Sequence, residues 1–251
     1  MEAQLQNWDN FCRYHATGDW YGTWTRYSPK GEVIESFQCI RSLQASEDGS
    51  EINHQNHYTY ADGKSETKTF GPYKKPNTVV LFLDNCFSWG STKVESGSSF
   101  SFETGFRHED RRASAAVAYN DSGRVQRIIV IPEHLASFAE ESPAPPADRL
   151  SGNWQGTLKK MTPDLIVSPP VATSWNQLEN LSENYQTLHF PDGISLSCPR
   201  QVESGKEFFM AVDWLINPTL LQRCIRHYGI SGFTSLTLEL FSLASGVCTA
   251  I

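Results

Sequence analysis

Hydrophobic and polar positions follow two different patterns along the chain. In residues 1–15, four apolar side chains recur at the spacing of one helix face, which predicts a short helix: Leu5, Trp8, Phe11 and Cys12. From Trp20 to about Glu133, short extended runs are separated by Asp-Gly, Pro-x-Gly and Ser-Gly turns. Residues 134–150 are rich in Pro and acidic side chains and predict a linker, after which the extended runs resume. Many short strands with little helix predict an all-β protein, an antiparallel barrel or sandwich.

A short phrase, Gly-(Asp/Asn)-Trp-x-Gly-Thr, occurs twice in the chain. It stands in GDWYGTW at residues 18–24 and in SGNWQGTL at residues 151–158. A second phrase, Tyr-x-x-Ser-Gly between two strands, also recurs and pairs four residues: Tyr119 with Tyr228, and Gly123 with Gly232. A period above a hundred residues indicates a duplicated domain. We therefore expect two domains of one kind, residues 16–133 and 151–251, joined by the linker.

The tryptophan of each Gly-x-Trp phrase has a mechanical use in a small barrel. Glycine lets the chain enter the closed end, and the indole two residues later fills that end. Trp20 and Trp154 are therefore predicted to be buried floor residues. An arginine from a late strand often stacks on such an indole. The candidates come from corresponding strands of the two halves: Arg111, Arg112, Arg223 and Arg226.

Four segments that sample the chain from end to end resemble a known family. They are QNWDNFCRYHATGDWYGTWTRYSPKGE, FETGFRHEDRRASAAVAYNDSGRV, LSGNWQGT and RCIRHYGISGFTSLTLE. The chain is similar to the uncharacterised two-barrel lipocalin-like family, of the calycin superfamily, from cyanobacteria and plastids. The resemblance implies two tandem lipocalin-like antiparallel barrels with a short N-terminal helix. It implies little about activity, because the family is a domain of unknown function and fold does not determine function.

The segment EINHQNHYTY, residues 51–60, is polar on both faces. Alternation places one set of candidate ligand-binding side chains on a single face: His54, Asn56, Tyr58 and Tyr60. Two interpretations stay open, because this face either lines a wet pocket or belongs to an exposed edge strand. His54 and His57 point to opposite faces, so one metal ion cannot contact both.

Charged and small side chains supply the other candidates in the first half. Arg111 and Arg112 either pair with a ligand carboxylate inside the barrel or pack on Trp20 and pair with nearby acids. Glu103 is either a pocket acid or part of a turn or salt bridge. Ala116 belongs to a run of small side chains that would leave space inside the barrel.

In the second half, the candidates lie on one strand. Arg223 and His227 share one face of this strand, and Arg226 lies on the other. One of the two faces must look into the barrel, where an Arg and a His could hold an anion. In the alternative, the long Arg stems lie at the barrel rim.

The composition excludes several classes of function. The net charge is −7 and no run of Lys or Arg exceeds two residues, so we expect no nucleic-acid partner. The longest apolar run, TVVLFL, is too short to span a bilayer, and the N-terminus lacks a signal peptide, so we expect no membrane insertion and a cytoplasmic location. Six Cys without a Cys-x-x-Cys pair predict neither a metal site nor a disulfide framework. The sequence contains no catalytic motif, and no cofactor is expected.

The expected function is the binding of a small, largely apolar ligand, such as a pigment, an isoprenoid or a fatty acid. An eight-stranded barrel is just wide enough for one such molecule. The small side chains at residues 113–116 place the expected cavity in the first barrel. Two alternatives stay open: an enzyme that uses the same pocket, as a bilin lyase or a cyclase or isomerase of a hydrophobic metabolite, and a structural or adaptor protein whose barrels are filled. The sequence leaves the oligomeric state open.

Overall fold

The structure begins with the helix that the sequence predicts. It is a computed structural model, and it describes residues 1–77, 79–140, 150, 152–176, 178 and 182–244. Helix α1 (Glu2–Asn10) continues into a π-helical turn, η1 (Phe11–His15). Among the described residues, no helix has both the length and the apolar character needed to cross a membrane.

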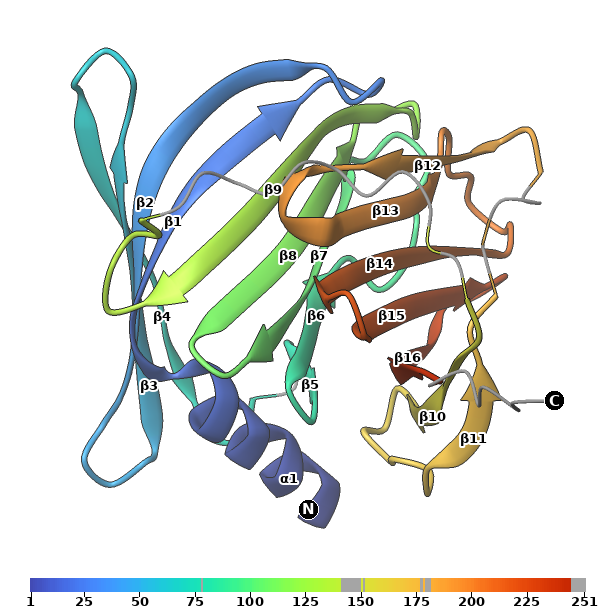
Figure 1. The fold of residues 1–251 in the computed structure, drawn as a ribbon, viewed down its shortest axis with the longest axis horizontal. Coiled ribbons are helices and arrows are strands. Elements are labelled where there is room, and N and C mark those ends of the chain that lie inside the picture. Colours follow the sequence, from blue (N-terminus) through green and yellow to red (C-terminus); the bar gives the residue numbers. More distant parts are fainter. Residues whose placement is uncertain (78, 141–149, 151, 177, 179–181, 245–251) are drawn as a thin grey trace, which may run out of the picture.

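The first half of the chain forms one nine-stranded antiparallel sheet. Its strands are β1 (Thr17–Tyr27), β2 (Val33–Ala45), β3 (Glu51–Thr59), β4 (Ser65–Lys74), β5 (Leu81–Leu83), β6 (Cys86–Gly90), β7 (Phe100–His108), β8 (Arg111–Tyr119) and β9 (Val125–Leu135). They are hydrogen-bonded in the order β4-β3-β2-β1-β9-β8-β7-β6-β5, so β1 and β9 are neighbours. The sheet curls around an interior, and α1 lies at one end of the curl (Figure 1).

The second half forms a seven-stranded antiparallel sheet with the same arrangement at its centre. Its elements are β10 (Trp154–Met161), β11 (Val171–Ser174), β12 (Tyr185–His189), the 3-10 turn η2 (Pro191–Gly193), β13 (Ile194–Pro199), β14 (Phe208–Asn217), β15 (Leu220–Gly229) and β16 (Gly232–Leu243). Their order is β11-β10-β16-β15-β14-β13-β12. The run β14-β15-β16-β10 therefore repeats the run β7-β8-β9-β1, as a duplication requires.

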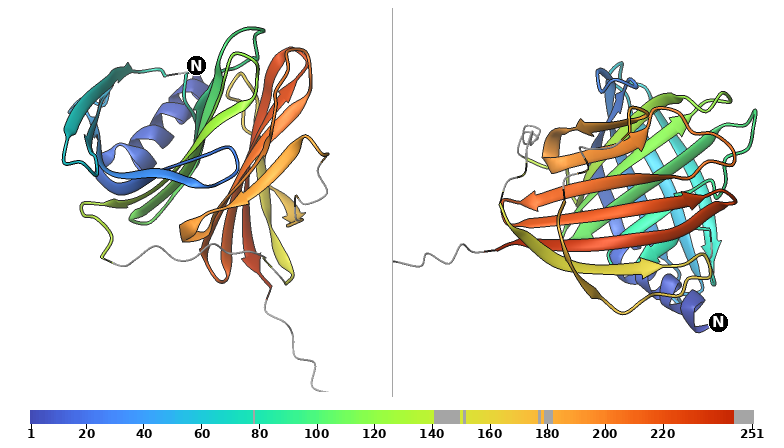
Figure 2. Two further views of the ribbon diagram at one scale, coloured as in Figure 1. Left: turned by 90° about the horizontal axis from the view of Figure 1, so that it is seen from above. Right: turned by 90° about the vertical axis from the view of Figure 1, so that its right-hand side faces the viewer.

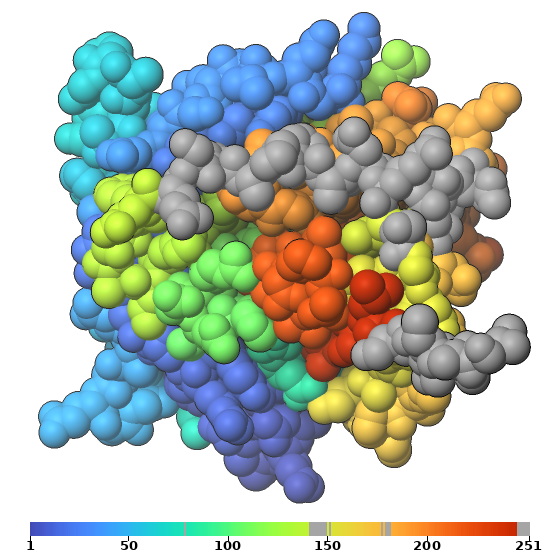
Figure 3. Space-filling view, viewed as in Figure 1, coloured from blue at the N-terminus to red at the C-terminus, as the bar shows by residue number. Residues whose placement is uncertain are grey.

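The two sheets lie face to face and share one hydrophobic core (Figure 2). Phe106 of β7 stacks on Trp214 of β14, with ring centroids 6.4 Å apart. Phe100 meets Phe208 edge to face at 5.9 Å. In the space-filling view the green residues of the first half lie directly against the orange and red residues of the second half, and we call this boundary between the two sheets the seam (Figure 3). The sequence pattern predicted two barrels connected by a linker, and it did not predict this shared core.

Strand β8 carries small side chains on both of its faces, and the two faces have different surroundings. Ala113, Ala115 and Val117 belong to the core between the sheets, where small side chains let the second sheet approach closely. Ala116 and Ala118 are half-buried and line the interior of the first sheet, where small side chains leave space.

The two tyrosines of the repeated Tyr-x-x-Ser-Gly phrase fasten the sheets reciprocally. The Tyr119 hydroxyl donates to the backbone carbonyl of Pro199 at 2.9 Å, at the end of β13. The Tyr228 hydroxyl donates to the carbonyl of Ser91 at 2.8 Å, just after β6. Tyr119, at the end of β8, is thus anchored at the end of β13, and Tyr228, near the end of β15, is anchored just after β6.

The glycines of the same phrase repeat this exchange. The Val202 amide donates to the carbonyl of Gly123 at 2.8 Å, and the Phe233 amide, beside Gly232, donates to the carbonyl of Thr92 at 2.6 Å. Both glycines have positive φ, +73° and +126°, and at each a Cβ atom would collide with a carbonyl oxygen of the other half. The turn that contains each glycine therefore lies directly against the backbone of the other half.

The boundary between the halves differs slightly from the predicted one. Strand β9 continues to Leu135, which pairs with Trp20 of β1. It therefore extends into the predicted linker, residues 134–150. Residues 141–149 of that linker lie outside the described residues.

Candidate functional site

A cavity of about 500 Å³ lies inside the curl of the first sheet. Most of its wall is apolar and comes from η1 and four strands: Phe11, Trp24, Phe82, Phe87, Ile129 and Ile131. Ala116 and Ala118 of β8 also line it and fill little of the space. Cavities of this size and character are typical of sites for small organic ligands.

Strand β3 supplies a chain of polar side chains to the cavity. His54, Asn56 and Tyr58 point inward and line it. The His54 ring lies 3.0 Å from the Tyr73 hydroxyl and 2.9 Å from Asn56 Oδ1, and Asn56 Nδ2 donates to Tyr58 Oη at 2.7 Å. Burial, with Arg41 nearby, lowers the pKa of His54 to about 4. The ring is therefore neutral at neutral pH, and the polar chain carries no charge.

Two arginines and two glutamates form a charged cluster across the interior: Arg41 of β2, Glu103 of β7, Arg112 of β8 and Glu133 of β9. Arg41 contacts acids on two other strands: its Nη2 lies 3.5 Å from Glu103 of β7 and its Nε lies 3.2 Å from Glu133 of β9. Arg112 Nε lies 3.7 Å from the second oxygen of Glu133. Glu103 also accepts hydrogen bonds from Ser114 Oγ and from Trp89 Nε1, each at 2.8 Å.

All four members of the charged cluster are buried and mutually compensated. Their exposed fractions are between 1% and 6%. Burial alone would raise the pKa of Glu103, but Arg41 and the hydrogen bonds to its oxygens lower it below the ordinary value. Burial lowers the pKa of Arg112 to about 10, which leaves it charged at neutral pH. Burial would also lower the pKa of Arg41, but Glu133 and Glu103 raise it. The cluster thus holds two positive and two negative charges.

Trp20 lies beneath the charged cluster and is fully buried. The Arg112 guanidinium stacks on its indole at 4.9 Å and that of Arg107 at 5.2 Å. Its Nε1 donates to the carbonyl of His15, the last residue of η1, at 3.0 Å. Of the two arginines considered for this contact, Arg112 makes it.

Some of the lining residues are exposed. Phe70 of β4, Val79 of the loop between β4 and β5, and Trp89 of β6 are 39%, 78% and 40% exposed. Arg127 of β9 is also exposed and lines the cavity. The cavity is therefore open to solvent.

Comparison with known proteins identifies the family of the chain. Residues 4–138 match the model of the N-terminal part of a domain of unknown function, DUF3598. The chain belongs to the DUF3598 family. This agrees with the resemblance to an uncharacterised family, and every residue that lines the cavity lies inside the matched part of the DUF3598 chain.

Other comparisons extend the likeness to the second half. Residues 171–240 match the C-terminal domain of Biogenesis factor required for ATP synthase 1. A crystal structure of a DUF3598-family protein of unknown function from Nostoc punctiforme is similar in fold, with a TM-score of 0.76 and 23% identity. The match covers 95% of this chain and 99% of that one. No curated protein matches the chain.

Two candidates in the first half of this DUF3598-family protein lie away from the cavity. Arg111 points to the second sheet, where it stacks on Trp214 at 5.4 Å and donates to the carbonyl of Ile216 at 2.9 Å. Tyr60 lies just beyond β3, and its hydroxyl donates to Glu66. The structure therefore gathers His54, Asn56, Tyr58, Glu103, Arg112 and Ala116 at the cavity, and not Arg111 or Tyr60.

The second-half candidates do not meet at one site. Arg226 lies in the seam between the sheets, where its Nε donates to Tyr228 Oη at 2.7 Å. Arg223 forms a bidentate ion pair with Asp213, in which Nε and Nη2 each donate to one carboxylate oxygen at 2.7 Å. Its neighbour on the same face, His227, has a pKa lowered by burial. Trp154 is buried and packs in a separate cluster with Leu221 and Phe241.

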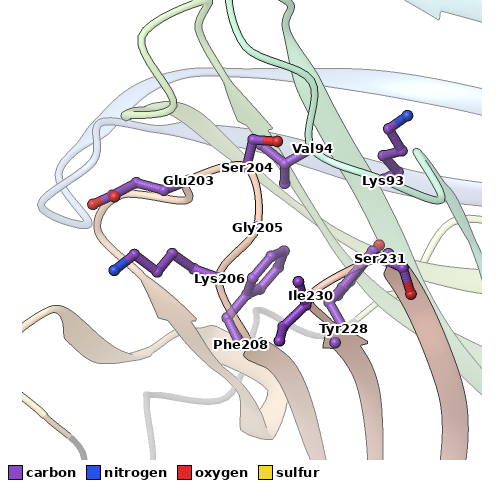
Figure 4. Close-up of a pocket in the computed structure, with 12 residues that line it drawn as sticks. Lys93, Val94, Glu203, Ser204, Gly205, Lys206, Phe208, Tyr228, Ile230 and Ser231 are labelled. Carbon is purple, nitrogen blue, oxygen red and sulfur yellow. The ribbon is translucent and has the colours of Figure 1, made fainter.

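A smaller cavity of about 230 Å³ lies at the seam, where Tyr228 and Phe208 meet the loop after β6 (Figure 4). The charged ends of Lys93 and Lys206 point outward from it in that view (Figure 4). Phe208 and Tyr228, which line this cavity, both pack on Phe100 of the first sheet. Among the described residues, no group of three or more His, Cys, Asp or Glu side chains is arranged to hold a metal ion.

Sequence reasoning missed Arg41 and Glu133, which hold the charged cluster together. Both break an otherwise apolar alternation. Arg41 follows Phe37 and Cys39 on one face of β2, and Glu133 follows Ile131 on one face of β9. A charge on a buried strand face is the signal that could have identified them, since such a charge is buried only with a partner.

Proposed function

We propose that the protein binds a small, largely apolar ligand in the cavity of the first sheet, which acts as a lipocalin-like container. The observation that carries the proposal is the open volume of about 500 Å³ behind an apolar wall. An apolar wall of this extent is unfavourable in contact with water, and covering it with an apolar molecule is favourable in proportion to the area removed from water.

The same cavity favours binding over an adaptor role, because an adaptor with a filled interior would have no such space. An enzyme that uses this pocket would first have to bind the same kind of molecule.

Filling the cavity tests the proposal. The Ala116→Phe substitution adds a large side chain inside the cavity, so we expect it to abolish binding of the neutral apolar dye Nile red. Ala172 on β11 is exposed, and Ala172→Phe is the matched control that adds the same volume outside. Circular dichroism and thermal unfolding establish that both variants fold. If the folded Ala116→Phe protein binds the dye as tightly as the control, the proposed site is wrong.

A second candidate function rests on the match of residues 171–240 to a factor required for ATP synthase biogenesis. We propose, as this second candidate, that the second sheet takes part in the assembly of ATP synthase. Deleting the gene in the source organism should then lower the amount of assembled ATP synthase. A chain with the Ala116→Phe substitution should restore it, since this function does not use the cavity. Unchanged ATP synthase in the deletion strain would remove this candidate.

A further inference from the structure

The exposed residues among those that line the cavity form a surface of their own. We call this surface the rim, and it consists of Phe70, Val79, Trp89 and Arg127. Other apolar lining residues, such as Trp24 and Phe87, are only 6% and 4% exposed. The rim is therefore where the cavity meets the solvent, and three of its four members are large apolar side chains.

The rim also holds the exposed aromatic side chains of the described part of the chain. Phe70 and Trp89 are exposed, whereas every other Phe, Trp and Tyr that the structure describes is buried or half-buried. Exposed apolar side chains that gather around one opening are typical of an interaction surface. Trp89 is exposed along its ring while its Nε1 donates to Glu103 at 2.8 Å. An indole with an apolar body and a satisfied polar end suits the boundary between lipid and water.

Positive charge is concentrated in the segment that carries Phe70, although the whole chain has a net charge of −7. Residues 64–75 contain four Lys and one Glu. Lys68 lies two residues from Phe70 on the same face of β4, over the Tyr58 ring at 5.5 Å. Its ion pair with Glu66 is exposed, and such pairs are weak enough to exchange partners. Arg127 of the rim forms no ion pair within the described ranges.

We infer that the rim docks on a lipid bilayer that contains anionic headgroups, so that the cavity opens onto the bilayer. The apolar rim residues enter the interfacial layer, and Arg127 and the lysines meet the lipid phosphates. A largely apolar ligand then passes between lipid and cavity without crossing water, which is unfavourable for it. The inference goes beyond the proposed function, because docking needs the rim and not an occupied cavity.

Flotation with phospholipid vesicles, without added ligand, tests the inference. The vesicles consist of phosphatidylcholine alone or of phosphatidylcholine mixed with the anionic lipid phosphatidylglycerol. The wild-type protein should bind the anionic vesicles at least about tenfold more tightly, because each basic side chain near such a surface strengthens binding several-fold. Raising the salt from about 0.1 M to about 1 M shortens the screening length from about 10 Å to about 3 Å, so this preference should disappear.

A matched pair of variants tests the position of the docking surface. Val79 and Val33 are exposed valines, 78% and 65%, but Val33 lies at the start of β2 and does not line the cavity. Val79→Asp and Val33→Asp add the same negative charge. Val79→Asp also removes an apolar contact with the lipid, so it should weaken binding to anionic vesicles at least about tenfold. Val33→Asp should leave it within about twofold of wild type, and circular dichroism establishes that both variants fold.

The outcomes separate the inference from the proposed function. If the wild-type protein does not bind anionic vesicles, the inference is wrong, and a protein partner at the rim would give this result. Equal loss of binding in Val79→Asp and Val33→Asp would show general charge repulsion and would also overturn it. Equal binding to both kinds of vesicle would remove the role of anionic headgroups. Each of these results leaves the Nile red test of the cavity standing, and failure of that test leaves the docking result standing.

Discussion

Replacing Gly123 by alanine tests whether the two halves depend on the reciprocal turns. Gly123 has a φ of +73°, and a Cβ atom there would lie 2.1 Å from the carbonyl oxygen of Val202. Val202 belongs to the second half, and its amide donates to the Gly123 carbonyl at 2.8 Å. Backbone atoms cannot give way as a flexible side chain can. The added methyl group must therefore push the turn away from the second sheet.

Gly97 provides the matched control for this substitution. Its φ is +75°, but nothing lies within 4 Å of a Cβ atom there. Alanine in the left-handed conformation costs about 1–2 kcal/mol, so Gly97→Ala should lower the free energy of unfolding by that amount. Gly123→Ala should also lose a backbone hydrogen bond, about 0.5–1.5 kcal/mol, and some packing around buried Val202. We expect a total loss of about 2–4 kcal/mol at Gly123.

Urea unfolding followed by tryptophan fluorescence measures both variants, because tryptophans occur in both halves. The shared core predicts a single cooperative transition for the wild-type protein. The variants should shift its midpoint without changing its slope, provided that both states keep their exposed surface. If Gly123→Ala loses no more stability than Gly97→Ala, the turn does not hold the sheets together and the account of the seam is wrong.

Two further predictions concern the cavity wall and the seam. As pH falls from about 6.5 to 4, the unfolded His54 ring binds a proton that the folded ring does not, so the free energy of unfolding should fall, by about 3 kcal/mol. His54→Asn should remove this part of the pH dependence in urea unfolding, and an unchanged profile would contradict the assignment. Tyr119→Phe and Tyr228→Phe each leave a carbonyl of the other half unpaired, so each should lower thermal stability, by about 1–2 kcal/mol. If both variants have the melting temperature of the wild-type protein, these two hydrogen bonds do not contribute to its stability.

The elements of the first sheet could be predicted from local patterns. Alternation in residues 51–60 placed His54, Asn56 and Tyr58 on one face and left open whether that face lines a pocket; the structure turns it into the cavity. The small residues of β8 indicated space, and Ala116 lines the cavity. Such grouping is possible from sequence because side-chain direction along a strand depends only on the strand itself.

The seam and the charged cluster could not be predicted in this way. Arg226 was a pocket candidate, but it lies between the sheets and bonds to Tyr228. Its face is polar in sequence and gives no sign that another sheet covers it. Arg41 meets Glu103 across the interior from a strand that is not its neighbour. Such contacts depend on how strongly the sheet curls, which a single sequence does not specify.

The shared core has a consequence for synthesis on the ribosome. The first sheet is complete once β9 has emerged from the ribosome. Phe100, Phe106 and Ala115 on its outer face are buried only by the second half, which is synthesised later. Translating roughly 100 further residues takes about 5–20 s. During that interval the nascent chain presents a broad apolar surface to the cell. The order of the halves therefore makes the cavity-bearing sheet the one that must be shielded, by a chaperone or by a delay in its own folding, until the second sheet arrives.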